Sequence, residues 1–243
     1  MSVDSVQSVN PATGEVLETF PVATPAEVQA AVARARHAQP AWAARPLAER
    51  KAVLSRAAAL IRGRETSLVR ELTEEQGKVL RESRWEIPDS AVRLDYFVSA
   101  ATEAMAADEG VVPNRFRFRN IQKPLGVIGA IKPWNFPFTI PIWTIAPAVL
   151  VGNSVVFKPS EYTPRMGRRI GELFRESGLP EHVLEIVYGA DATGRSLVSS
   201  DVEMISFVGS QSAGRDIMRS SADHLRKLAL ELGGKDPMIV CAD

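Results

Sequence analysis

The chain has 243 residues, enough for one large or two small domains, and 45% hydrophobic with 24% charged residues is ordinary globular composition. Its 29 basic and 29 acidic residues cancel to a formal net charge of zero, which favours neither nucleic acid nor an anionic membrane as a partner. The single cysteine, Cys241, excludes an internal disulfide framework, and the first residues lack a signal-peptide pattern, so we expect a cytoplasmic protein. The longest apolar stretch, residues 136–151, is interrupted by prolines and is too short to span a membrane.

The first third of the chain is predicted to be helical. Thr24-Pro25-Ala26-Glu27 combines a capping box with proline at the first helical position, and the helix that it opens should end near Gln39-Pro40. Apolar periodicity predicts further helices over residues 47–62, 65–76 and 89–105. Alanine dominates these segments, which indicates close helix packing.

The pattern changes to a period of two over residues 114–122, where Phe116 and Phe118 alternate with arginines. This alternation is typical of a strand with one solvent-exposed face. The arginines could form a phosphate-binding patch. A solvated or subunit-facing strand is the preferred interpretation, because arginine stems tolerate exposed sheet faces.

From residue 126 onward, short β-rich runs alternate with helical ones. Strands are expected at 126–131, 154–158, 183–188, 203–208 and 227–232, with helices at 140–151, 165–177, 193–198 and 212–221. Strands separated by helices of this length pair in parallel through right-handed crossovers. The predicted fold class is therefore α/β, a doubly wound open parallel sheet of the Rossmann-like type, preceded by helices. A further exposed apolar strand is expected at 237–242.

Polar or glycine-rich clusters follow all five of these strands. In an open parallel sheet, ligands bind outside the carboxyl ends of the strands, so the clusters should meet at one edge. They are the segments 132–137, 158–161, 189–194, 209–210 and 231–235.

Two of these clusters suggest a phosphate site. Gly209-Ser210 lies between a strand and a helix, where backbone N–H groups can meet an anion, although a plain turn with a serine cap would look the same. Residues 189–196, GADATGRS, resemble a P-loop with Arg195 in place of lysine. Arginine does not substitute freely there, and no metal-binding aspartate ends a later strand, so nucleotide hydrolysis is disfavoured.

Glu161 and Lys158 follow the second strand of the sheet, where a carboxylate can accept hydrogen bonds from ribose hydroxyls. A surface ion pair is the alternative. Because a carboxylate repels a 2′-phosphate, NAD is favoured over NADP, with NADP still possible.

Glu231 and Asn135 are the candidate catalytic residues. A carboxylate at the end of an apolar strand can serve as a general base, and an asparagine amide can stabilise an oxyanion. A carboxylate that simply ends a strand, and an asparagine in a proline-rich turn, are the competing interpretations. The histidines, His37, His182 and His224, have no ligand-like spacing, so no metal site is expected.

Taken together, these residues resemble the aldehyde dehydrogenase superfamily. The matching stretches occur in the family's order and cover nearly the whole chain: Asn10-Pro-Ala-Thr-Gly14, Pro133-Trp-Asn-Phe-Pro137, Lys158-Pro-Ser-Glu161, Phe207-Val-Gly-Ser210 and Leu230-Glu-Leu-Gly-Gly-Lys235.

The resemblance implies a role for each matched residue. Asn135 is similar to the family's oxyanion donor and Glu231 to its general base, while Lys158 and Glu161 match positions that hold the adenosine ribose. Ser210, with Gly209 beside it, matches the helix terminus that faces the pyrophosphate, Gly189 a glycine near the adenine, and Trp134 an aromatic near the nicotinamide. The remaining residues assigned to the cofactor site are Ile131, Lys132, Pro133, Ser160, Gly194, Phe207, Leu232 and Gly233.

The resemblance also implies a domain plan. Residues 1–106 and 124–243 would form the dinucleotide-binding domain with its helices, and residues 107–123 a hairpin of the kind that family members use to form homo-oligomers. The family's catalytic cysteine lies in a second domain beyond the LELGGK segment, which these residues do not include.

In the complete family mechanism a cysteine thiolate attacks the aldehyde, hydride passes to the nicotinamide, and the glutamate activates water to release a carboxylic acid from a thioester. Cys241 lies in an apolar run and is expected to be a small buried hydrophobic residue instead of that nucleophile. The favoured interpretation is that these 243 residues are an inactive portion of such an enzyme. The alternative is a non-catalytic dinucleotide-binding or assembly module, which would need neither Asn135 nor Glu231.

Overall fold

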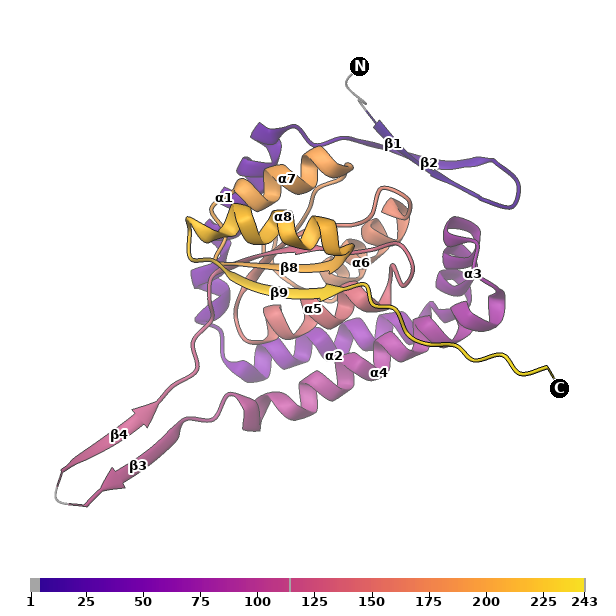
Figure 1. Ribbon diagram of the computed structural model, residues 1–243. Coiled ribbons are helices and arrows are strands. Elements are labelled where there is room, and N and C mark those ends of the chain that lie inside the picture. The colour runs from indigo at the N-terminus through magenta and orange to yellow at the C-terminus, as the bar shows by residue number, and fades with distance from the viewer. Residues whose placement is uncertain (1–4, 114, 243) are drawn as a thin grey trace.

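The computed structural model describes residues 5–113 and 115–242, and its elements follow one another as shown in Figure 1. In chain order they are β1 (Ser5–Val9), β2 (Val16–Pro21), α1 (Pro25–Ala43), α2 (Leu47–Gly63), α3 (Glu65–Gln76), α4 (Leu80–Ala104), β3 (Asp108–Val112), β4 (Phe116–Asn120), β5 (Val127–Ile131), α5 (Thr139–Leu150), β6 (Ser154–Lys158), α6 (Pro164–Glu176), β7 (Leu184–Ile186), α7 (Asp191–Ser199), β8 (Met204–Gly209), α8 (Gln211–Ala222) and β9 (Lys227–Leu232).

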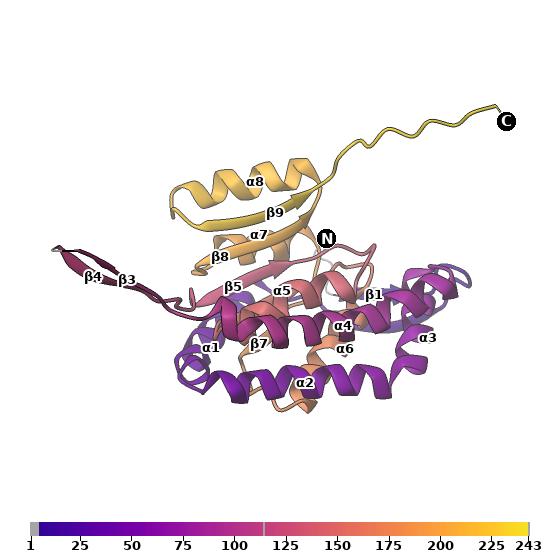
Figure 2. The same cartoon turned by 90° about the horizontal axis from the view of Figure 1, so that it is seen from below.

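A five-stranded parallel sheet lies at the centre, in the order β7-β6-β5-β8-β9. Helices cover both of its faces, as the view from below makes clear (Figure 2). In one apolar cluster, the helices α2, α3, α4, α5 and α6 pack against sheet side chains such as Ile128 and Phe157. In a second, α1, α7 and α8 pack against Ile131 and Phe207. The doubly wound α/β fold is thus confirmed, with all five predicted strands in place.

The capping box that opens α1 is also confirmed. Thr24 accepts a hydrogen bond from the Glu27 backbone N–H, and Glu27 accepts one from the Thr24 backbone N–H. The helix nevertheless continues past the expected end at Pro40, to Ala43. Buried Trp42, whose indole N–H donates to the Val149 carbonyl at 2.7 Å, stabilises this extra turn by tertiary packing.

The prediction for α4 began too late. The helix was expected to start at residue 89, yet α4 begins at Leu80 and carries Pro88 inside it. The prediction therefore missed the two turns that contain Glu86. Those turns bear directly on the functional site.

The prediction of an all-helical first third was also incomplete, because β1 and β2 form an antiparallel hairpin before α1. Its turn is closed by Asn10, whose side chain accepts from the Ala12 N–H and whose carbonyl accepts from the Gly14 N–H. Ser8 of β1 donates to the buried carboxylate of Glu75 at 2.7 Å, which fastens the hairpin to α3.

The expected hairpin after α4 is confirmed as the antiparallel pair β3–β4, which projects from the body of the molecule (Figure 1). The predicted strand 114–122 starts at Asn114, which lies outside the described residues. Every residue of β4 is exposed in this chain, which is consistent with the solvated or subunit-facing strand that the sequence favoured. Among the described residues, β3 and β4 pack mainly against each other.

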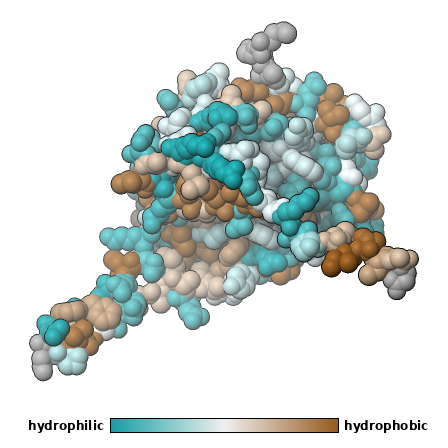
Figure 3. Space-filling model, in the orientation of Figure 1, coloured by the Kyte–Doolittle hydropathy of each residue, from teal (hydrophilic) through white to brown (hydrophobic). Residues whose placement is uncertain are grey.

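Residues 237–242 do not form the expected strand. After β9 the segment runs away from the sheet without regular structure, and apolar side chains gather on it (Figure 3). Met238 and Ile239 are each 88% exposed, and Cys241 is exposed. Cys241 is therefore not the buried hydrophobic residue predicted, because nothing in the described chain covers this segment.

Within the described ranges, none of the helices combines the length and the apolar character that crossing a membrane requires.

A buried ion pair connects α4 to the segment that follows β5. Lys78 Nζ and the Glu86 carboxylate lie 2.5 Å apart with side chains 5% and 0% exposed, and the same ammonium donates to the Asn135 carbonyl at 2.8 Å. The other Glu86 oxygen accepts the backbone N–H groups of Phe138 and Thr139. One carboxylate thus holds both Lys78 and the start of α5.

Replacing Glu86→Gln tests this connection. The amide keeps the side-chain shape but leaves the Lys78 ammonium buried without an anion, so we expect the free energy of unfolding to fall by about 3 kcal/mol or more in urea titrations. The control is Asp95→Asn, which breaks the Arg62–Asp95 pair, half exposed on both sides, and should cost less than about 1 kcal/mol. Equal effects of the two substitutions would contradict the assigned role.

Candidate functional site

Two adjoining cavities lie at the edge where the strands of the sheet end. Their volumes are about 1220 Å³ and about 760 Å³, and we call them the first and the second cavity. Residues from the ends of β5 and β8 line both: Lys132, Pro133, Trp134, Val208, Gly209 and Ser210. The predicted convergence of the segments after these strands therefore occurs, and the two cavities share these lining residues.

The second cavity collects most of the residues that the sequence assigned to a cofactor. They are Ile131, Lys132, Pro133, Trp134, Lys158, Ser160, Glu161, Gly194, Phe207, Gly209 and Ser210. Leu232 and Gly233 line the first cavity instead, and Gly189 lines neither cavity, although its neighbour Ala190 lines the second. Gly189 has φ +144°, and a Cβ there would lie 2.0 Å from the Thr193 hydroxyl. The conformation of the β7–α7 turn therefore explains why this residue is a glycine.

Lys158 and Glu161 form an ion pair on the wall of the second cavity. Their Nζ and Oε2 atoms are 3.1 Å apart; the Lys158 side chain is 7% exposed and that of Glu161 33%. From the sequence, these two residues could form either a surface ion pair or a ribose-binding site. In the structure they do form an ion pair, and it lies at the wall of a cavity instead of on an open surface.

The start of α8 is the other polar feature of this cavity. Ser210 is the N-cap of α8, and its hydroxyl accepts the Ala213 N–H at 3.2 Å. Within the described chain, the backbone N–H groups of Gln211 and Ser212 have no acceptor, as expected at a helix amino terminus. Such N–H groups, with the positive end of the helix dipole, favour an anionic ligand.

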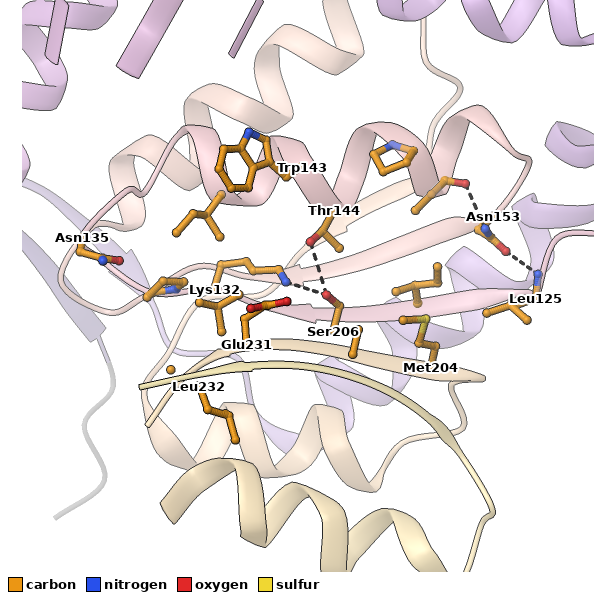
Figure 4. A pocket seen from close by; sticks show the side chains of 18 of the residues that line it. Leu125, Lys132, Asn135, Trp143, Thr144, Asn153, Met204, Ser206, Glu231 and Leu232 are labelled. Atoms are coloured by element: carbon orange, nitrogen blue, oxygen red, sulfur yellow. Dashed lines mark hydrogen bonds between the residues drawn. The ribbon is translucent and has the colours of Figure 1, made fainter. Parts of the chain in front are cut away.

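The first cavity holds both candidate catalytic side chains, together with Leu232 and Gly233. Asn135 is exposed on the segment after β5, and its carboxamide has no hydrogen-bond partner among the described residues. Glu231 is exposed at the end of β9 (Figure 4). An amide donor on the segment after β5 and a carboxylate at the end of β9 thus line the same cavity, which suits oxyanion stabilisation and proton removal.

Lys132 lies between these groups and is buried, at 3% exposure. Its Nζ donates to the Ser206 hydroxyl at 2.7 Å, and Thr144 Oγ1 of α5 lies 3.4 Å from the same hydroxyl (Figure 4). Burial lowers the pKa of Lys132 to about 7, and the nearby charge of Glu231 partly opposes that shift. Neither Ser206 nor Thr144 was predicted from the sequence; the available signals were a serine inside an apolar strand and a threonine inside an apolar helix.

The segment that carries Asn135 is held from the side of α4. The Lys78 ammonium lies 4.2 Å from the centre of the Phe136 ring, and Trp85 meets the same ring edge-on at 6.1 Å. Lys78 and Glu86 were not predicted from the sequence, because both precede residue 89, where the helix was expected to start. The available signal was a lysine and a glutamate eight positions apart in the stretch between two predicted helices.

No group of three histidine, cysteine, aspartate or glutamate side chains comes close enough to hold a metal ion in the part of the chain that the structure describes.

Comparisons with known proteins agree with this geometry. The family model for the aldehyde dehydrogenase family matches residues 1–243. The betaine aldehyde dehydrogenase 1 of Rhizobium meliloti (strain 1021) is 38% identical over 240 residues, which are 98% of this chain and 49% of that protein. The chain therefore spans about half the length of the curated relatives that it matches.

Solved structures give the same result. The lactaldehyde dehydrogenase from Escherichia coli superposes with a TM-score of 0.90 at 35% identity, over 96% of this chain and 50% of that one. The structure of PnpE in complex with nicotinamide adenine dinucleotide gives 0.91 at 36% identity, over 95% and 48%. On its sequence, its fold and the arrangement of its site, the chain belongs to the aldehyde dehydrogenase family.

Proposed function

We propose that this chain is the NAD-binding part of an aldehyde dehydrogenase that, when complete, oxidises an aldehyde to a carboxylic acid through a thioester. The observation that carries the proposal is that the two cavities adjoin and share lining residues from the ends of β5 and β8. One is walled by the Lys158–Glu161 pair and the start of α8, and the other contains Asn135 and Glu231. A dinucleotide has two unlike ends, and these are two unlike compartments that share the lining residues Lys132 and Gly209.

The second cavity would hold the adenosine and pyrophosphate. Glu161 and Lys158 would hydrogen-bond the ribose hydroxyls, and the N–H groups of Gln211 and Ser212 would face the phosphates. Gly194 supports this assignment, because a Cβ there would meet nothing within 4 Å and the absent side chain leaves the cavity open. Gly189 would act indirectly, by shaping the turn before α7.

The first cavity would be the reaction site. The bound nicotinamide would supply the hydride acceptor, with Trp134 beside it. Asn135 would donate its amide N–H to the oxygen that becomes negative, and Glu231 would take a proton from the water that hydrolyses the thioester.

The attacking thiolate would come from sequence outside these 243 residues. Cys241 is their one cysteine, and it lies on the extended segment after β9, among the lining residues of neither cavity. A pure binding module would need no amide donor and no general base, so the presence of Asn135 and Glu231 favours the enzyme over that alternative.

We also propose that residues 1–106 and 124–243 form one dinucleotide-binding domain, and that residues 107–123 form an arm for homo-oligomers. The projecting hairpin supports this division, because Val111 and Phe116 on it are 63% and 58% exposed. Apolar side chains on an isolated hairpin gain stability when another surface covers them.

The nucleotide preference tests the assignment of Glu161. In calorimetric titrations the chain should bind NAD at least tenfold more tightly than NADP, because the carboxylate repels a 2′-phosphate. Glu161→Gln should narrow that ratio to about threefold or less. Glu65→Gln, an exposed glutamate at the start of α3, is the matched control and should leave the ratio unchanged. Absence of NAD binding at millimolar concentration, or a preference for NADP, would refute the proposal.

Gly194→Leu tests where the nucleotide lies. Leucine is a better helix former than glycine, so the variant should keep or slightly raise its stability while the side chain enters the second cavity. NAD affinity should fall by tenfold or more. Gly63→Leu is the control, since Gly63 also lies in a helix with nothing within 4 Å of its missing Cβ, far from the site. Unchanged affinity in Gly194→Leu would place the nucleotide elsewhere.

A further inference from the structure

The floor of the first cavity carries a transverse row of side chains. In the parallel register Ile131 lies opposite Phe207, and Val208 lies opposite Glu231. Because side chains alternate between the faces of a sheet, Lys132, Val208 and Glu231 point to the same face on neighbouring strands. Ser206, two residues before Val208, shares that face. The register thus brings one ammonium, one hydroxyl and one carboxylate together.

Lys132 is held in this row although its burial is costly. Removing an ammonium from water is unfavourable, and its one hydrogen bond is to the neutral Ser206 hydroxyl. An apolar side chain of the same length would fill the space without that cost. A strongly perturbed lysine in a cavity, beside a specific charge, is a pattern typical of functional sites.

The anion that faces Lys132 in this cavity is Glu231. The two residues are two strands apart, roughly 10 Å between Cα atoms by ordinary strand spacing, and the long lysine side chain covers part of that distance. Within the described chain they make no direct ion pair, so their interaction is through space, as the effect of Glu231 on the pKa of Lys132 indicates. Figure 4 shows the Glu231 carboxylate beside the Lys132 amine and Ser206.

Other charges around Lys132 are farther along the cavities or already paired. Lys123 lines the end of the first cavity where β5 begins, and α5 and β8 contribute no charged side chain to its lining. On the side of the second cavity the charged lining residues are Lys158, Glu161, Asp191, Arg195 and Asp216, of which Lys158 pairs with Glu161, and Arg195 lies near both aspartates.

We propose that Lys132 is a positioning residue for Glu231: its ammonium, fixed by Ser206, stabilises the ionised Glu231 carboxylate on the cavity side of the sheet. The functional meaning rests on the proposed role of Glu231 as general base, whereas the coupling itself is a property of this chain without any ligand. Since burial brings the pKa of Lys132 to about 7, the strength of the coupling should change around neutral pH. Glu231 would lose this stabilisation as Lys132 loses its proton.

The test is a pair of reciprocal titrations by NMR on the 243-residue chain without nucleotide, with ¹³C labels at lysine Cε and glutamate Cδ. We expect Lys132 to titrate near neutral pH, and Glu231→Gln to lower its midpoint by roughly one pH unit. In turn, Lys132→Met should raise the Glu231 midpoint by a similar amount, because the interaction of two titrating groups is reciprocal.

Lys123→Met is the matched control, since it removes a lysine from the far end of the same cavity and should leave both midpoints unchanged. Lys132→Met should keep or raise the melting temperature, which distinguishes a positioning role from a structural one. Glu231 is exposed, so Glu231→Gln is expected to fold and gives a result even if Lys132→Met does not.

The proposal would be overturned by a Lys132 midpoint above about 9 that stays unchanged in Glu231→Gln. A Glu231 midpoint that stays unchanged in Lys132→Met would also overturn it. A loss of NAD affinity in Lys132→Met with unchanged Glu231 titration would also overturn it, and would make Lys132 a phosphate ligand instead. Because the titrations need no nucleotide, failure of the proposed NAD binding would leave their result intact.

Discussion

The parallel register of β5, β8 and β9 is the constraint on which the site depends. It fixes which side chains share a face, so that Phe207 and Ile131 join the core beneath α1, α7 and α8 while Ser206, Lys132 and Glu231 face the first cavity. A shift of one residue in any of these strands would exchange the two sets. The carboxyl ends then lie at one edge, where the turns after the strands form the cavity walls.

The segment after β5 needs support that the sheet cannot give. It leaves the sheet with four successive exposed or half-exposed residues, at positions 133–136, before α5 begins. The buried Lys78–Glu86 pair holds its backbone from α4. Helices that precede the sheet in sequence thereby take part in placing Asn135, so the amino-terminal region serves both packing and the site.

Much of this could be predicted from the sequence because its signals are local. A few adjacent residues are enough to predict each of three features: the alternation of strands and helices, the capping box at Thr24 and the glycine-rich turns. From these features the sheet and the walls of the cavities could be predicted. Errors arose where distant contacts override local preference. Trp42 extends α1 beyond Pro40, α4 carries Pro88 internally, and the β1–β2 hairpin is fastened through Ser8 to Glu75. The Lys132–Ser206 contact spans 74 positions and has no local signature.

A crystal structure of the chain with NAD bound is the most direct test of the two cavities. The adenosine should lie in the second cavity between Glu161 and Gly194, the phosphates at the start of α8, and the nicotinamide in the first cavity with Asn135 and Glu231 on the same side of the sheet. A dinucleotide bound away from these cavities, or one whose nicotinamide lies remote from both side chains, would contradict this arrangement.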